Sequence, residues 1–233
     1  MLGQVLKGRY QLIRELGSGG FGQTYVARDL CHAKVSTCVV KQLKPASSDV
    51  TFLKVARRLF DTEVATLKRL GTHSCIPKLL DSFEEHQEFY LVQELIDGES
   101  LGDEIRRTGG LSEGQAIVLL QETLEILEFV HDHRVIHRDL KPDNLIRRQG
   151  DGKLCLIDFG AVKEIRTQLM DSELTSLTVG IGTQGYTPSE QLAGKPRFNS
   201  DIFALGMTAI HGLTGRTPTE IPEEMSSLEL RWE

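Results

Sequence analysis

One segment, residues 135–146 (VIHRDLKPDNLI), constrains the fold of this 233-residue chain more than any other. Asp139, Lys141 and Asn144 lie close together in it, and apolar residues flank them on both sides. A polar loop present only for solubility would not need such flanks, so we expect both ends to be anchored in a core. Asp139 could accept a proton from a hydroxyl, Lys141 could neutralise a phosphoryl group, and Asn144 could bind a hard cation through its amide oxygen.

A second carboxylate follows at the end of an apolar run. Residues 156–160, LIDFG, have the pattern of a buried strand that ends in Asp158 and a glycine. A metal–phosphate site requires a second oxygen ligand of this kind beside the first. We therefore predict that Asp158 and Asn144 bind the same cation.

These two segments together carry a family signature. Residues 137–144, HRDLKPDN, and residues 158–160, DFG, match the H-R-D-L-x-x-x-N and D-F-G motifs of protein kinases. The chain resembles a serine/threonine protein kinase. Its segments CVVKQLKP and GTQGYTPSEQ are most similar to bacterial, specifically cyanobacterial, members. The resemblance implies an α+β, two-lobed protein-kinase-like fold. Residues 1–96 would form an N-lobe with a five-stranded antiparallel sheet and one helix, and residues 97–233 a mostly helical, C-terminally incomplete C-lobe.

A glycine-rich loop lies near the N-terminus. Residues 10–16 and 24–27 have strand patterns, and GSGGFG at residues 17–22 separates them. The alternative is a dinucleotide-binding turn, which needs a helix directly after the glycines and an acid about 20 residues later. Because a strand pattern follows here, we favour a hairpin whose backbone N–H groups close over phosphates. The family usually has Val where this chain has Thr24, whose methyl group can still pack on an adenine ring.

The third expected strand, residues 37–43, carries Lys41 inside an apolar run. A lysine there usually only faces outward, but the resemblance makes Lys41 a ligand of the α- and β-phosphates, which requires a carboxylate to hold its ammonium. A helix expected over residues 52–70 places Glu63 on or beside its apolar stripe, where an unpaired carboxylate is costly. We predict the Lys41–Glu63 ion pair that kinases use, although a lone glutamate on a surface helix is ordinarily exposed.

Two further strands, residues 76–83 and 88–93, complete the expected sheet before helical patterns begin. By resemblance, the segment that follows is the hinge between the lobes, where the backbone of Glu94 and Ile96 would pair with adenine. Gln93 would guard the deeper pocket. The predicted contacts of ATP are Leu16, Gly17, Gly19, Gly22, Thr24, Val39, Lys41, Glu63, Gln93, Glu94, Ile96 and Ile146.

The catalytic loop has supporting residues before and after it. A capping box of Ser112 and Gln115 opens an expected helix whose apolar spacing indicates core packing. By resemblance, His137 belongs to the core beside Phe159 rather than to catalysis. Asp201, in an apolar helix expected over residues 199–213, would brace the catalytic loop, and Thr183 would hydrogen-bond to it. The predicted catalytic residues are Asp139, Lys141, Asn144 and Thr183, and the predicted metal ligands are Asn144 and Asp158.

Residues 161–180 are polar and rich in hydroxyl groups, so we expect a mobile activation segment. Arg138 would receive a phosphate attached there, although solubility is the simpler explanation for any single hydroxyl. Residues 188–190, PSE, depart from the family's A-P-E, and the helices and the arginine that pairs with the position of Glu190 are not in this sequence. The cyanobacterial members that the chain resembles often carry further C-terminal domains, so the resemblance implies a piece of a longer protein. The candidate phosphorylation sites are Thr167, Ser172, Thr175, Ser176 and Thr178, with Thr175 or Ser176 favoured.

Composition limits the partners. A net charge of −6 argues against nucleic acid or an anionic membrane as the main partner. No apolar run has the pattern of a signal peptide or the length of a membrane span. The four cysteines are scattered without a C-x-x-C pair, which indicates reduced thiols in a cytoplasmic protein.

The sequence predicts a signalling enzyme that phosphorylates Ser or Thr of protein substrates with ATP and Mg²⁺, with Asp139 as the catalytic base. Lys141 favours Ser/Thr over Tyr by resemblance only. The alternative is a nucleotide-binding, pseudokinase-like scaffold or an inactive fragment of a larger signalling protein. Degenerate kinases usually lose one of the residues that correspond to Lys41, Asp139 and Asp158, and this chain retains all three. The missing C-terminal helices favour the alternative for this piece alone.

Overall fold

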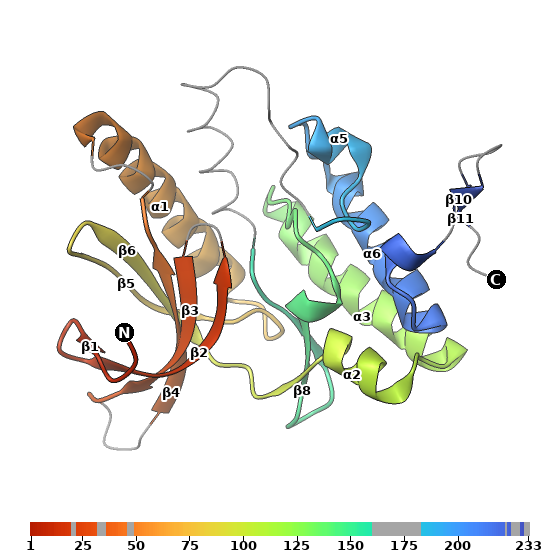
Figure 1. Cartoon of the computed structure of the whole chain (residues 1–233), viewed down its shortest axis with the longest axis horizontal. Coiled ribbons are helices and arrows are strands. Elements are labelled where there is room, and N and C mark those ends of the chain that lie inside the picture. Colours follow the sequence, from red (N-terminus) through yellow and green to blue (C-terminus); the bar gives the residue numbers. More distant parts are fainter. Residues whose placement is uncertain are drawn as a thin grey trace. The chain divides into compact units, whose positions relative to one another are not determined.

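The computed structural model describes residues 1–19, 22–31, 36–45, 49–159, 183–221, 223–224 and 229–230. The chain divides into two compact units, Met1–Ile96 and Asp97–Glu233, and each unit has its own sheet and at least one helix (Figure 1).

The first unit is built on a six-stranded antiparallel sheet with the strand order β1-β2-β3-β4-β6-β5. The five predicted strands are present as β2 to β6. Strand β1 was not predicted, because a strand of two residues cannot show an alternating pattern. The strands are β1 (Val5–Leu6), β2 (Tyr10–Gly19), β3 (Gly22–Asp29), β4 (Ser36–Leu43), β5 (Leu79–Glu85) and β6 (Glu88–Glu94).

Two strand boundaries differ from the sequence prediction. Strand β5 begins at Leu79 rather than at residue 76, because Pro77 lacks the N–H group that a sheet ladder needs. Strand β2 runs on to Gly19, which pairs with Gly22 of β3. The described glycines on the two sides thus pair between antiparallel strands, as the predicted hairpin requires, and a strand rather than a helix follows them.

Helix α1 (Val50–Leu70) covers one face of this sheet. Phe60 of α1 stacks on Phe89 of β6 with ring centroids 4.9 Å apart. Side chains two residues apart in a strand share a face, so Leu91 and Gln93 lie on the face of Phe89. The ladder sets Lys41 opposite Leu91. The face that α1 covers is thus also the face that carries the predicted phosphate-binding lysine.

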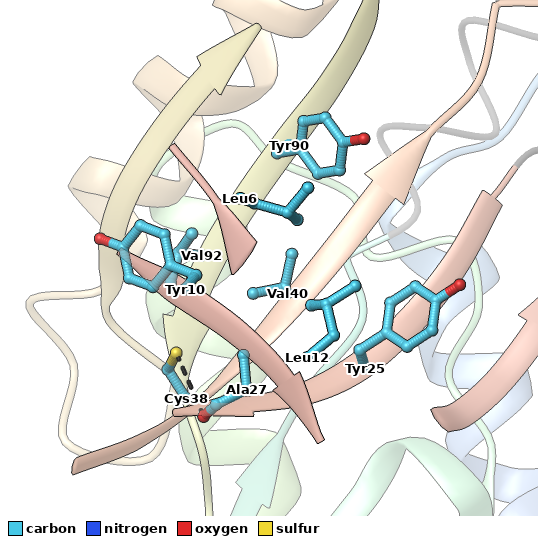
Figure 2. Close-up of a cluster of buried hydrophobic side chains, with 9 residues drawn as sticks. All are labelled: Leu6, Tyr10, Leu12, Tyr25, Ala27, Cys38, Val40, Tyr90 and Val92. Atoms are coloured by element: carbon cyan, nitrogen blue, oxygen red, sulfur yellow. Dashed lines mark hydrogen bonds between the residues drawn. The ribbon is translucent and has the colours of Figure 1, made fainter. Parts of the chain in front are cut away.

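The opposite face of the sheet has an apolar cluster of its own (Figure 2). Strand β1 supplies Leu6, whose side chain is fully buried there, and Phe83 of β5 packs against the cluster from its edge. Burying a large apolar side chain contributes about 1.5–3 kcal/mol, so both faces stabilise the sheet. The cluster consists of Leu6, Tyr10, Leu12, Tyr25, Ala27, Cys38, Val40, Tyr90 and Val92.

The second unit contains two long helices that lie side by side, α3 (Glu113–Asp132) and α6 (Phe198–Thr214) (Figure 1). The predicted capping box opens α3, with Gln115 N donating to Ser112 Oγ at 3.3 Å and Ser112 N donating to Gln115 Oε1 at 2.9 Å. The other elements are β7 (Gly98–Ser100), α2 (Leu101–Thr108), η1 (Pro142–Asn144), β8 (Leu145–Arg148), β9 (Leu154–Leu156), α5 (Ser189–Leu192), η2 (Pro218–Glu220), β10 (Glu223–Glu224) and β11 (Glu229–Leu230).

Strands β7, β8 and β9 form a small antiparallel sheet that the sequence analysis did not predict as a unit. Its strands β8 and β9 follow directly on the catalytic loop, because η1 leads into β8 and β9 ends just before Asp158. In the described parts of the chain, no helix is both long enough and apolar enough to cross a membrane. All four cysteines lie in the described parts of the chain, and none of them forms a disulfide bond.

Candidate active site

Asp201, at the start of α6, holds the turn that precedes the catalytic loop. Its side chain is 1% exposed. It accepts hydrogen bonds from His137 N and Arg138 N, each at 2.9 Å, and lies 2.8 Å from His131 Nε2. A buried carboxylate is costly unless such donors surround it. The brace that the sequence predicted is therefore present.

Arg138 and Asp158, like Arg134 before the catalytic loop, adopt a left-handed backbone that is uncommon outside glycine. The φ angle is 67° at Arg138 and 61° at Asp158. Such a conformation costs about 1–3 kcal/mol and persists only where neighbouring contacts enforce it. At Arg138 these contacts act on both sides, since Asp201 accepts from its N–H and Gln191 Nε2 donates to its carbonyl oxygen at 2.7 Å. Residues in sparsely populated conformations cluster at functional sites.

His137 is a core residue, as predicted. Its ring is fully buried and meets the ring of Phe159 edge-on, with centroids 4.8 Å apart. Burial lowers the pKa of His137, so the imidazole is neutral. Its Nε2 lies 3.0 Å from the carbonyl oxygen of Ile157, which assigns the proton to that nitrogen. Nδ1 then accepts from Asp139 N at 3.3 Å, and the imidazole helps to set the catalytic loop.

The structure brings the four predicted catalytic residues together. Thr183 Oγ1 donates to Asp139 Oδ1 at 3.0 Å, and Asn144 Nδ2 approaches Asp139 Oδ2 at 3.1 Å. Lys141 Nζ lies 3.0 Å from Thr183 Oγ1 and 3.5 Å from Asp139 Oδ2. Both oxygens of the Asp139 carboxylate are therefore fixed by neighbours, and a cation stands beside them. A carboxylate held in this way is oriented to receive a proton.

A backbone hydrogen bond brings the segments of the two predicted metal ligands together. Ile157 N donates to the carbonyl oxygen of Asn144 at 2.9 Å, which brings the residue before Asp158 next to Asn144. Asn144 also uses its amide nitrogen on the carbonyl oxygen of Asp139 at 2.7 Å, so its amide oxygen is the atom with which it can bind a cation. One carboxylate and one amide oxygen, completed by phosphate and water, suit Mg²⁺.

No cluster of three or more His, Cys, Asp or Glu side chains that could hold a metal occurs among the residues that the structure describes. A Mg²⁺ ion bound with a nucleotide does not require one, because it usually keeps waters and takes only one or two carboxylates. The donor set at Asn144 and Asp158 therefore fits that ion.

The nucleotide contacts predicted on β3, β4 and β6 share one face of the sheet. The ladder pairs Thr24 with Lys41 and Val39 with Gln93. This is the face that α1 covers, and Glu63 of α1 is buried, with 4% of its surface exposed. The placement fits the predicted Lys41–Glu63 pair, which stays a prediction.

The glycine-rich hairpin holds the other predicted contacts of the first unit. Leu16 is exposed near the end of β2, Gly17 pairs with Thr24, and Gly19 pairs with Gly22. A side chain at Gly22 would collide with the carbonyl oxygen of Gln42 in the neighbouring strand, so the position requires glycine. The backbone can approach a ligand closely here.

The predicted hinge residues differ in what their backbone can offer. Glu94 N donates to the carbonyl oxygen of Lys78 at 2.9 Å, so a contact between Glu94 and adenine would have to use the Glu94 carbonyl. Ile96 is half-buried and is the last residue of the first unit. Ile146 belongs to the second unit, on β8 opposite Cys155. Their contacts with ATP stay predictions.

Glu190 has a partner that sequence reasoning missed. Ser200 Oγ donates to Glu190 Oε1 at 2.7 Å and lowers the pKa of that carboxyl group. The predicted phosphorylation sites Thr167, Ser172, Thr175, Ser176 and Thr178 lie outside the described residues, as does Gly160. Sequence reasoning also missed Gln191 and the buried pair of Tyr186 and His211, since contacts between distant residues leave no periodic signal.

Comparison with known proteins identifies the family. The sequence model of the protein kinase domain family matches residues 10–231, so the chain belongs to this family. It is 45% identical over 232 residues to serine/threonine-protein kinase B of Synechocystis sp. (strain ATCC 27184 / PCC 6803 / Kazusa), covering 98% of this chain and 40% of that protein. It is 44% identical over 231 residues to serine/threonine-protein kinase PknA of Nostoc sp. (strain PCC 7120 / SAG 25.82 / UTEX 2576), covering 98% and 41%. The chain thus spans about two fifths of the length of these curated relatives.

Solved structures support the same fold. The kinase domain of Mycobacterium tuberculosis PknI matches with a TM-score of 0.68 and 23% identity, covering 98% of this chain and 85% of that chain. Its C20A_R136N double mutant matches with a TM-score of 0.72 and 22% identity, covering 98% and 84%. The predicted α+β kinase fold is therefore confirmed, with β1 as an additional strand in the sheet of the first unit.

Proposed function

We propose that this chain transfers the γ-phosphoryl group of ATP to a serine or threonine hydroxyl of a protein substrate. The cluster of Asp139, Lys141, Asn144 and Thr183 carries the proposal, because it fixes a carboxylate at both oxygens beside a cation. The identity to relatives named serine/threonine-protein kinases supports the substrate class.

In this proposal the residues mainly position groups and balance charge, since phosphoryl transfer leaves little covalent work to the protein. Asp139 orients the substrate hydroxyl and takes its proton on a carboxylate oxygen. Lys141, beside it, offsets negative charge that gathers as the phosphoryl group moves. Asp158 and Asn144 would hold Mg²⁺, which would neutralise part of the negative charge of the phosphates. Lys41, held by Glu63, would bind the α- and β-phosphates.

The scaffold alternative has less support. A scaffold without catalysis has no use for a fixed proton acceptor, whereas Asp139 sits in a network that involves Thr183 and Asn144. The purified protein is tested with Mg²⁺ and ATP labelled at the γ-phosphate, with a generic basic protein as acceptor. We expect label on Ser or Thr. Nucleotide binding without any transfer would favour the scaffold.

Lys41→Met should lower kcat/KM for ATP by about 100-fold or more, because the predicted pair with Glu63 and the predicted phosphate contact would both be lost. Steady-state transfer assays at varied ATP concentration measure the effect. Lys44→Met is the matched control. Lys44 is half-exposed, and its Nζ lies 3.5 Å from a Glu88 carboxylate oxygen. Such a surface ion pair contributes little to stability. If Glu63→Gln leaves the rate unchanged while Lys41→Met abolishes it, the Lys41–Glu63 pairing is wrong.

Incubation with Mg²⁺ and ATP should attach phosphate to the chain itself between Thr167 and Thr178, with Thr175 or Ser176 as the preferred site. A phosphate carries about −1.5 to −2 charges and forms charge-assisted hydrogen bonds with arginine, here Arg138. Mass spectrometry of the treated protein locates the modification, and Asp139→Asn serves as the inactive control. A preparation that phosphorylates an added substrate but carries no phosphate in this range would show that Arg138 serves another partner.

A further inference from the structure

Tyr186 and His211 form a buried polar pair that the proposed reaction does not use. Tyr186 Oη lies 2.6 Å from His211 Nδ1. The two residues are only 8% and 7% exposed. A buried phenol or imidazole without a hydrogen-bond partner is costly, so each group stabilises the other. Tyr186 lies in the turn after Thr183, and His211 lies in the last part of α6, so the pair ties the turn to that helix.

The tied turn leads directly to the catalytic carboxylate. Tyr186 N donates to the carbonyl oxygen of Thr183 at 3.1 Å, and Thr187 Oγ1 donates to the same oxygen at 3.1 Å. Thr183 in turn donates its hydroxyl proton to Asp139 Oδ1. A continuous chain of hydrogen bonds and one short turn therefore connects His211 of α6 to Asp139.

Packing on the other side of the turn leaves it little freedom. Gly185 has a φ angle of 84°, and a side chain at this position would come within 2.6 Å of Pro218 Cβ in η2. Only glycine fits both the backbone conformation and the space. The turn is thus held between η2 on one side and the hydrogen bond to α6 on the other.

The pair is uncharged. Burial raises the pKa of the Tyr186 phenol and lowers the pKa of the His211 imidazole. The charged groups that face His211 come from three other elements: Asp143 of η1 and Glu220 of η2 favour its protonated form, and Arg106 of α2 opposes it. Desolvation outweighs these opposing influences, so a neutral hydrogen bond links the two rings.

We propose that Tyr186 and His211 are positioning residues, which fix the turn so that Thr183 holds the Asp139 carboxylate in its productive orientation. The inference rests on the proposed kinase activity, in which His211 of α6 would position the catalytic carboxylate. Neither residue touches the reacting groups. Loss of the pair should therefore reduce the turnover of bound substrates and leave the KM for ATP unchanged.

The test is a set of kcat measurements at saturating ATP and acceptor protein. Tyr186→Phe, which removes only the hydroxyl, should lower kcat by about tenfold, the equivalent of one hydrogen bond. His211→Leu should have a similar effect, and the double variant should be no worse than either single one. His211→Asn keeps a polar atom near the place of Nδ1 and should retain most of the activity.

A Thr183→Ala background separates positioning from general destabilisation. If the pair acts through Thr183, then Tyr186→Phe should have no further effect in this background. Tyr90→Phe is the matched control, since it also removes a buried phenol hydroxyl, one that lies 2.7 Å from Glu88 on the sheet face away from Lys41. It should leave kcat unchanged.

The outcomes separate this inference from the function on which it rests. An active parent whose Tyr186→Phe variant keeps the parental kcat, or loses the same factor with and without Thr183, overturns only the positioning role. A parent that transfers no phosphate overturns the proposed function and the positioning role with it. Hydrogen exchange of residues 183–192 gives an independent measure, and exchange that is no faster in Tyr186→Phe contradicts the anchor regardless of activity.

Discussion

Replacing Asp158 with asparagine should abolish phosphoryl transfer while the fold persists. Asparagine has nearly the same shape and tolerates the left-handed backbone found at this position, where φ is 61°. It lacks the negative charge that a divalent cation requires, so we expect a loss of about 1,000-fold or more in kcat, comparable to the removal of a principal electrostatic group. Transfer assays measure the rate, and circular dichroism verifies the fold.

Asp151→Asn provides the matched control for that experiment. Asp151 is also an aspartate of the second unit, but it lies in an exposed turn and pairs with Arg148 at 2.7 Å. Its loss should leave the rate unchanged. An Asp158→Asn protein that transfers phosphate at the parental rate would show that Asp158 is not a metal ligand, and the site would have to be assigned again.

Asp201→Asn should impair both stability and turnover. The carboxylate accepts from two backbone N–H groups and contacts His131, and an amide can satisfy only part of this set because its NH₂ group is a donor. Leaving a buried donor unsatisfied costs about 1–3 kcal/mol, and the left-handed turn at Arg138 loses its support. We expect a lower denaturation midpoint together with a kcat reduced by about 100-fold.

Chemical denaturation and steady-state kinetics of the same preparation check both parts of this prediction. Asp132→Asn, an exposed aspartate at the end of α3, is the control and should change neither quantity. A variant that is destabilised but turns over at the parental rate when folded would mean that Asp201 supports the fold without setting the catalytic loop.

Motifs placed the candidate residues better than they predicted the backbone. The sequence singled out Asp139, Asn144 and Asp158 because their residue types and spacing can be read directly from it. It also predicted the brace by Asp201, although only through the family resemblance. The left-handed conformation of Arg138 had no such sign, since nothing in an arginine indicates positive φ.

Contacts between distant parts of the chain were the least predictable. The bond from Gln191 to the Arg138 carbonyl and the bond from Ser200 to Glu190 join residues whose positions follow only from the packed helices. Periodicity shows which face of a helix is buried, but not which polar atom meets which. The two-residue strand β1 was missed for a related reason, because its place depends on the sheet that it joins.

The position of Asp201 in the sequence also determines when the catalytic turn can be stabilised during synthesis. Asp201 follows His137 by 64 positions, so during synthesis the catalytic turn is made before the residue that holds it. At about 5–20 residues per second, that interval is roughly 3–13 s. Once Thr183 has been made, a nascent chain has all four predicted catalytic side chains but still lacks the acceptor that fixes the turn. The catalytic loop therefore cannot reach its final conformation until α6 has emerged and folded.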